Sequence, residues 1–167
     1  MRNDDSAAIT LRPADANDEA FLYRLYASSR SEELAAWGWD SARQEAFLNL
    51  QFRAQQAHYR EYPNTDHQII LCGEHPIGRL LVSGLEDEFR LVDIALLPEH
   101  RNAGIGEALI RELLERARRS GKAVRLHVEK TNRAQRLYQR LGFKPIGDAG
   151  SHFFLEWQPT EKGDEGQ

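Results

Sequence analysis

Hydrophobic and polar positions recur along the chain in two different periods. Apolar residues at every second position, in runs bounded by Pro, Gly or polar turns, predict strands at residues 9–12, 67–72, 76–83, 89–97, 123–130 and 152–157. Apolar residues three and four positions apart predict helices at 15–29, 41–62, 104–120 and 133–141. The segment Ser31–Asp40 between the first two helices is predicted to be irregular, or a short helix with a glycine break.

This order of elements predicts one α/β (α+β) domain with a mixed, mostly antiparallel sheet and helices on both faces. Short turns, such as Gly73-Glu74-His75, join the central strands, so those strands are expected to be antiparallel. A helix joins 89–97 to 123–130, so this pair is expected to be parallel. A length of 167 residues corresponds to a single domain, with an ordered core over 8–158 and loose ends at 1–7 and 160–167.

Cysteine content and hydropathy narrow the class of protein. The only cysteine, Cys72, excludes an intrachain disulfide and a cysteine-based metal cluster, and its apolar surroundings predict an inert thiol rather than a nucleophile. The N-terminus has no apolar signal segment, and no apolar run is long enough to span a bilayer. We therefore expect a cytoplasmic protein without membrane contact. The histidines show no metal-binding spacing, so no metal is expected.

The charge of the chain is unevenly distributed. Residues 101–144 hold twelve Lys or Arg and four Asp or Glu, a local charge of +8 in a chain whose net charge is −4. A basic segment in an acidic protein indicates a local anionic ligand rather than nucleic acid. The alternative is a solvated helical surface.

A glycine-containing turn, Arg101-Asn102-Ala103-Gly104-Ile105-Gly106, lies inside this basic segment, between a predicted strand and a predicted helix. Glycines let the backbone approach a ligand, and the first amides of a helix are free to bind phosphate. The turn is neither a Walker A loop nor a GxGxxG dinucleotide motif. A plain strand-to-helix turn is the alternative.

Two strings together resemble the signatures of the GNAT superfamily of acyl-CoA-dependent N-acyltransferases. Residues 101–106 resemble its pyrophosphate motif, (Gln/Arg)-x-x-Gly-x-(Gly/Ala), and Asn132-Arg133-Ala134 followed by residues 137–143, LYQRLGF, resembles Asn-x-Ala…Leu-Tyr-x-x-x-Gly-Phe. The resemblance covers residues 89–143 at the level of motifs. One departure is Asn102, where many members have glycine. It is expected to be harmless if this residue is not in a left-handed conformation.

The resemblance implies that acetyl-CoA is the co-substrate and that strands 89–97 and 123–130 splay apart around its pantetheine arm. The arm would pair with the backbone of Ile94, Ala95 and Leu96, and the Leu96 amide would hold the thioester carbonyl. The pyrophosphate would lie on the turn and the start of its helix, at Arg101, Asn102, Ala103, Gly104, Ile105, Gly106 and Glu107. Asn132 would reach the arm, and Arg136 and Arg133 would meet phosphates.

The resemblance also implies direct transfer of an acetyl group to a primary amine, with Tyr138 as the general acid at sulfur. For the general base, the candidates are His127 and Asp93, and a water chain is the alternative. Acidic and aromatic residues in Ser31–Asp40 favour a small cationic amine as the acceptor and partner. A protein N-terminus or lysine is the alternative acceptor, and a non-catalytic CoA-binding module is the alternative of another class. The sequence does not decide whether the protein is a monomer or a homodimer.

Overall fold

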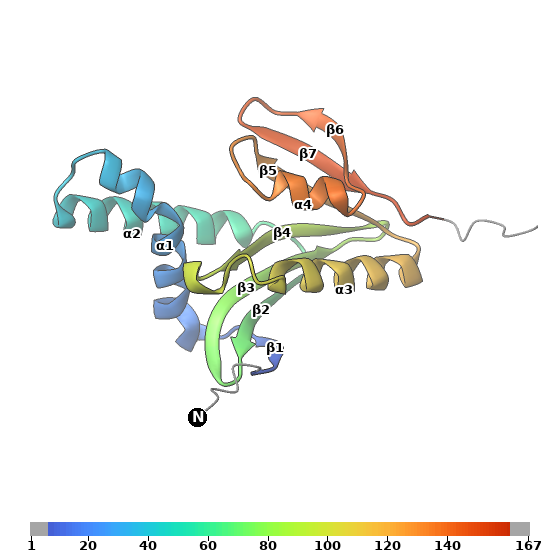
Figure 1. Cartoon of the computed structure of the whole chain (residues 1–167), viewed down its shortest axis with the longest axis horizontal. Coiled ribbons are helices and arrows are strands. Elements are labelled where there is room, and N and C mark those ends of the chain that lie inside the picture. Colours follow the sequence, from blue (N-terminus) through green and yellow to red (C-terminus); the bar gives the residue numbers. More distant parts are fainter. Residues whose placement is uncertain (1–6, 161–167) are drawn as a thin grey trace, which may run out of the picture.

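Seven strands form a single mixed sheet in the computed structural model, which describes residues 7–160 (Figure 1). The strands are β1 (Ile9–Pro13), β2 (Thr65–Cys72), β3 (His75–Gly84), β4 (Glu88–Leu96), β5 (Ala123–Glu129), β6 (Lys144–Asp148) and β7 (His152–Trp157). The α-helices are α1 (Glu19–Ala36), α2 (Ser41–Tyr59), α3 (Ile105–Ser120) and α4 (Gln135–Arg140). No helix within the described range is both long and apolar enough to cross a lipid bilayer. Most of the predicted loose ends, 1–6 and 161–167, lie outside the described residues.

The strand order is β1-β2-β3-β4-β5-β7-β6, and every neighbouring pair is antiparallel except β4 and β5. The register of this parallel pair is short, with Glu88 opposite Ala123, Phe89 opposite Val124 and Arg90 opposite Arg125. Beyond Arg90 the pairing ends while β4 continues along β3 to Leu96. The predicted mixed sheet with a splayed parallel pair is therefore confirmed.

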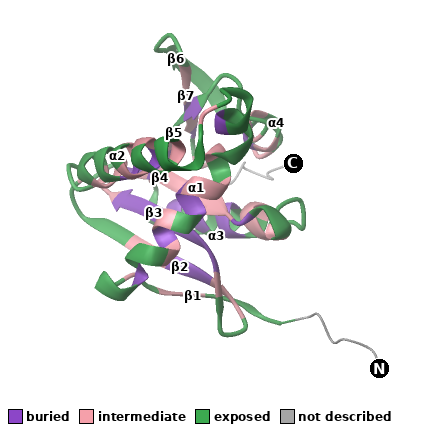
Figure 2. Cartoon of the chain, turned by 90° about the vertical axis from the view of Figure 1, so that its left-hand side faces the viewer, coloured by how far each residue is buried: buried purple, intermediate pink, exposed green. Residues whose placement is uncertain are grey.

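The two faces of the sheet bury separate groups of side chains. Figure 2 shows the long buried stretches on β2 and β3, among helices that are largely exposed. On one face, Leu80, Val82 and Leu91 pack with the apolar stripe of α3. On the other face, Ile69 packs with α1 and α2, including Phe52. The register of the strands sets this division, because successive side chains point to opposite faces.

Two elements differ from those predicted. The segment Ser31–Asp40, predicted to be irregular or a short helix with a glycine break, is helical up to Ala36 and breaks at Gly38, which has a φ of 69°. It differs from the second alternative in being continuous with α1, because Leu34 is almost fully buried against the α1–α2 core. Strand β6 was not predicted at all. All of its residues are exposed, and it contains Pro145 and Gly147, so it lacks an alternating apolar pattern and forms only by pairing with β7.

Candidate functional site

The start of α3 presents free backbone amides. Gly104 is the N-cap in a left-handed conformation, with a φ of 81° and no side chain to cap the helix. The Ala108 amide makes the first helical hydrogen bond, to the Gly104 carbonyl at 3.1 Å, so the amides of Ile105, Gly106 and Glu107 have no acceptor within the helix. A Cβ on Gly104 would meet no heavy atom within 4 Å, so the backbone angle, not space, favours glycine here. Together with the helix dipole, these amides form a site for an anion such as phosphate.

The turn before this helix contains a second left-handed residue. Asn102 has a φ of 61°, which is a left-handed conformation. The replacement of glycine by Asn102 was expected to be harmless only outside this conformation, so that condition is not met. Asn is one of the few residues with a side chain that enters this region readily, which explains how it replaces glycine. The guanidinium Nε of Arg101 donates to the Leu96 carbonyl at 3.0 Å and holds the turn against the end of β4.

Strand β4 exposes part of its backbone to the gap left by β5. The Leu97 amide donates to the Ile77 carbonyl of β3 at 2.8 Å. Because the hydrogen-bonding groups of a strand alternate in direction, those of Ala95 also point to β3, whereas those of Ile94 and Leu96 point into the gap. Ile94 and Leu96 are therefore placed as expected for binding an extended ligand, but the Ala95 backbone is directed away from it.

Helix α4 borders the same gap. The side-chain oxygen of Asn132 accepts a hydrogen bond from the Ala134 amide at 2.9 Å and so helps to start this helix. Arg136 is exposed in its first turn. Glu107 of α3 bonds to Arg140 of α4 at 3.3 Å and to Arg111 at 3.0 Å, which ties the two helices together.

Tyr138 is buried where α4 packs on the main core, with only 6% of its surface exposed. Its ring lies edge-on to Phe143 at 5.5 Å between centroids. Burial, followed by the negative charge of Asp93, raises the pKa of Tyr138 to about 12. The phenol is therefore protonated throughout the neutral range, and the carboxylate of Asp93 on strand β4 contributes to this.

Asp93 itself is held by a buried arginine. The Nε of Arg79 donates to an Asp93 carboxylate oxygen at 2.6 Å, and the Arg79 side chain is only 3% exposed. Gln55 and Tyr59 of α2 supply further oxygen partners for the same guanidinium, at 2.8 and 3.4 Å. Burial, followed by the charge of Asp93, raises the pKa of Tyr59 well above its usual range. Sequence reasoning did not single out Arg79, although an arginine inside the apolar run PIGRLLV is a signal that a buried partner exists.

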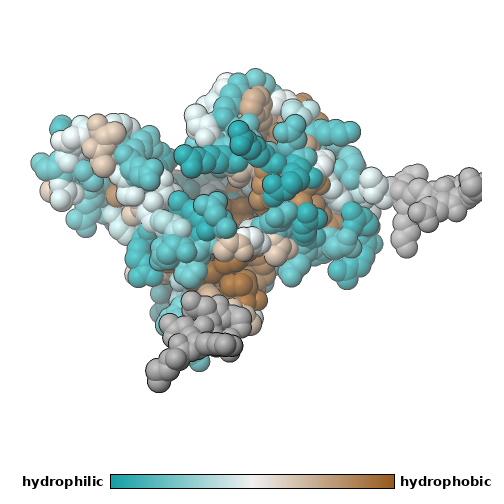
Figure 3. Space-filling model, in the orientation of Figure 1, coloured by the Kyte–Doolittle hydropathy of each residue, from teal (hydrophilic) through white to brown (hydrophobic). Residues whose placement is uncertain are grey.

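His127 is exposed on β5, on the sheet face that α2 covers, and its ring stacks on Phe154 of β7 at 4.6 Å. Partial burial, followed by the positive charge of Arg90 and then the charges of His152 and His58, lowers the pKa of His127. His58 belongs to α2, so β5 and α2 face each other across a groove. Figure 3 shows the surface hollowed between the α1–α2 hairpin and the β5–β7 part of the sheet. We call this hollow the α2–β5 groove.

The acidic and aromatic residues of Ser31–Asp40 mostly contact their own surroundings. An Asp40 carboxylate oxygen accepts the Arg43 amide at 2.8 Å and caps α2, and Glu33 pairs with Arg30 at 3.1 Å. Trp37 and Trp39 pack edge-on to each other and to Phe47. These contacts leave few acidic groups of the segment free to bind a cation.

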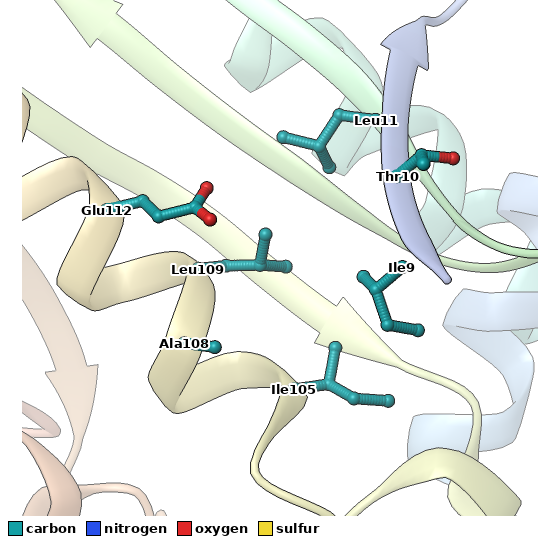
Figure 4. Close-up of a pocket in the computed structure, with 7 residues that line it drawn as sticks. All are labelled: Ile9, Thr10, Leu11, Ile105, Ala108, Leu109 and Glu112. Atoms are coloured by element: carbon teal, nitrogen blue, oxygen red, sulfur yellow. The ribbon is translucent and has the colours of Figure 1, made fainter. Parts of the chain in front are cut away.

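A separate depression lies between β1 and α3 (Figure 4). Its lining is mainly apolar and includes Ile9, Leu11, Ile105 and Leu109, with Glu112 at one side. It contains no candidate catalytic side chain. Cys72 is half-buried at the end of β2. Among residues 7–160, no cluster of three His, Cys, Asp or Glu side chains could hold a metal ion.

Comparison with known proteins agrees with this architecture. The model of the acetyltransferase (GNAT) family matches residues 22–143. The ribosomal protein bS18-alanine N-acetyltransferase of Haemophilus influenzae is 24% identical over 127 residues, which cover 74% of this chain and 75% of that protein. The PaiA N-acetyltransferase of Thermoplasma acidophilum, solved in complex with coenzyme A, has a TM-score of 0.69 at 19% identity and covers 90% of this chain and 99% of its own. The ribosomal-protein-S18-alanine N-acetyltransferase of Escherichia coli has a TM-score of 0.63 at 16% identity, with 95% and 98% covered. The chain therefore belongs to the acetyltransferase (GNAT) family.

Proposed function

We propose that this acyltransferase moves an acetyl group from acetyl-CoA to a primary amine by direct attack of the amine on the thioester. A new N–C bond forms as the C–S bond breaks, the amine loses a proton, and the departing sulfur gains one. The observation that carries the proposal is the combination of free amides at the start of α3 with outward-facing backbone at Ile94 and Leu96, where β4 and β5 have separated. Tyr138, whose phenol stays protonated, is buried where α4 packs on the core of the same sheet.

The residues around the gap fit the parts of acetyl-CoA. The amides of residues 105–107 and the basic side chains nearby suit a pyrophosphate. The Ile94 and Leu96 backbone suits the amide groups of a pantetheine arm, and the Leu96 amide suits the thioester oxygen, where a preorganised donor typically contributes about 10²–10³ in rate. Tyr138 would then donate the proton to sulfur, for which a phenol that stays protonated is suited.

We propose His127, rather than Asp93, as the general base. A lowered pKa leaves the imidazole of His127 neutral and able to accept a proton at neutral pH, and its side chain is exposed in the α2–β5 groove. Asp93 already accepts a short hydrogen bond from the buried Arg79, so its carboxylate has a structural partner. A chain of waters is the remaining route for the proton.

Two classes of acceptor are candidates. A small amine suits the α2–β5 groove, although the acidic groups expected to attract a cationic amine are largely engaged elsewhere. A polypeptide α-amine is the second candidate, since a relative of similar length is named as an alanine N-acetyltransferase of a ribosomal protein.

The proposal is tested by release of free thiol from acetyl-CoA in the presence of amino acids, small amines, polyamines and short peptides, one at a time. We expect amine-dependent release that Tyr138→Phe strongly reduces. Tight acetyl-CoA binding, seen by calorimetry, without release by any amine would instead identify a non-catalytic CoA-binding module.

A further inference from the structure

A row of charged side chains crosses the sheet beneath the α2–β5 groove. Glu156 of β7, Arg125 of β5, and Glu88 and Arg90 of β4 lie on the same face, because Arg90 pairs with Arg125 and Arg125 with Glu156 in the register. Arg125 bonds to Glu156 at 2.7 Å and approaches Glu88 at 3.5 Å, and Glu88 in turn meets Arg90 at 3.4 Å. The charges therefore alternate in sign, and Arg90 is the last cation of the row.

Arg90 is poorly satisfied compared with the other arginines of this face. Its hydrogen bond to Glu88 is long at 3.4 Å, and its Nε is buried without a hydrogen-bond partner among the described residues. By contrast, Arg79 and Arg125 each make a short bond to a carboxylate, at 2.6 and 2.7 Å. A guanidinium has five donors, and leaving them unfilled where water is scarce costs free energy. Arg90 is 17% exposed, so a ligand can reach it.

Arg90 also lies beside the proposed base. Its guanidinium is 4.9 Å from the centre of the Phe154 ring, and the His127 ring stacks on the same phenyl group at 4.6 Å. The positive charge of Arg90 contributes to the lowered pKa of His127. An acceptor whose amine is at His127 therefore has its neighbouring groups within reach of Arg90.

We propose that Arg90 binds a carboxylate of the acyl acceptor, so that the acceptor is an amino-carboxylate such as a free amino acid. This inference rests on the proposed function. A carboxylate would bind the terminal nitrogens of Arg90, since its Nε is buried, and would extend the alternating row of charges by one anion. The same guanidinium would repel a polyamine, so it would favour acceptors that carry a carboxylate and disfavour acceptors that carry additional positive charge.

The test compares free amino acids with their carboxamides, which keep the amine but lose the negative charge. Thiol release is measured for each pair with the unaltered enzyme, and with Arg90→Gln, Arg90→Lys and the exposed helix variant Arg119→Gln as a control of equal charge change. We expect kcat/KM to favour the acid by about 10- to 100-fold in the unaltered enzyme and in the control, since a hydrogen bond to a charged group contributes on that scale. Arg90→Gln should remove the preference, mainly through KM, and Arg90→Lys should keep part of it.

Three results would overturn the inference. Equal rates with acid and amide in the unaltered enzyme would refute it while leaving the proposed function intact, and this comparison does not depend on any variant folding. An acid preference that survives Arg90→Gln would place the carboxylate on another residue. No thiol release from any amine, with or without a carboxylate, would remove the proposed function and this inference together.

Discussion

Gly78 of β3 allows β4 to lie close enough to present its backbone to the gap, and a methyl group there should disturb both stability and acetyl-CoA binding. A Cβ at this position would lie 2.2 Å from the Ala95 carbonyl oxygen and 2.8 Å from a methyl carbon of Leu96. Contacts below 3.0 Å essentially do not occur for real Cβ atoms, and the nearest atom is backbone, which cannot rotate away. Gly78→Ala must therefore push β4 away from β3 at the residues that face the gap.

The cost can be scaled from the size of the clash. Overpacking a well-filled site typically costs about 1–3 kcal/mol, and a clash with backbone belongs near the upper end, at about 2–3 kcal/mol. For a domain of this size each kcal/mol lowers the melting temperature by roughly 2–4 °C, so we expect a decrease of about 5–10 °C. Thermal unfolding followed by circular dichroism measures this change, and calorimetric titration with acetyl-CoA should show weaker binding because Leu96 has moved.

Gly84→Ala is the matched control, because it adds the same methyl group to the same strand. A Cβ on Gly84 would meet its nearest atoms at 3.9 Å, which is ordinary contact, so this variant should unfold close to the unaltered protein and bind acetyl-CoA equally well. Equal melting temperatures for the two variants would refute the reasoning that close approach of β4 requires glycine at position 78.

Three further substitutions test the remaining parts of the site. His127→Ala should remove the acidic limb of the profile of kcat/KM against pH, because only the neutral form of His127 accepts a proton. In the unaltered enzyme the midpoint of this limb should lie below about 6.5, since the pKa of His127 is lowered. An unchanged limb would reject His127 as the base. Asp93→Asn should instead act on stability, at a cost of about 3–5 kcal/mol in chemical denaturation, since it leaves the buried positive charge of Arg79 without a carboxylate partner. Tyr138→Phe should lower kcat by about 100-fold or more with little change in acetyl-CoA affinity, and full activity would remove Tyr138 from the mechanism.

The sequence was sufficient to predict the elements that have a strong internal pattern. The α3 helix was predicted from its apolar stripe, and its glycine turn was predicted as an anion site because that property depends only on local backbone. Strand β6 could not be predicted, since its exposed residues gain their structure only from β7. The last turns of α1 were likewise stabilised by a distant contact, the burial of Leu34 against α2.

Within the site, the sequence identified candidate residues, but it did not predict the contacts that those residues make. Asp93 and His127 were equivalent candidates as polar residues on neighbouring strands, and only the position of Arg79 distinguishes them. That pairing joins residues fourteen positions apart across two strands, with partners from α2, and no local pattern encodes it. The need for glycine at position 78 is also a tertiary property, because it depends on how closely β4 approaches.

In the proposed mechanism, the splay of β4 and β5 would let the acid and the base act on the same reaction without contacting each other. Tyr138 belongs to the side of the sheet covered by α3 and α4, whereas His127 faces α2, and only the opening between the strands connects the two sides. After burial, the negative charge of Asp93, on the α2 side, is the second cause of the raised pKa of Tyr138 on the other side. An amine entering from the α2–β5 groove and a thioester lying in the gap would therefore meet between the two residues. The proton then leaves toward one face of the sheet and is replaced at sulfur from the other.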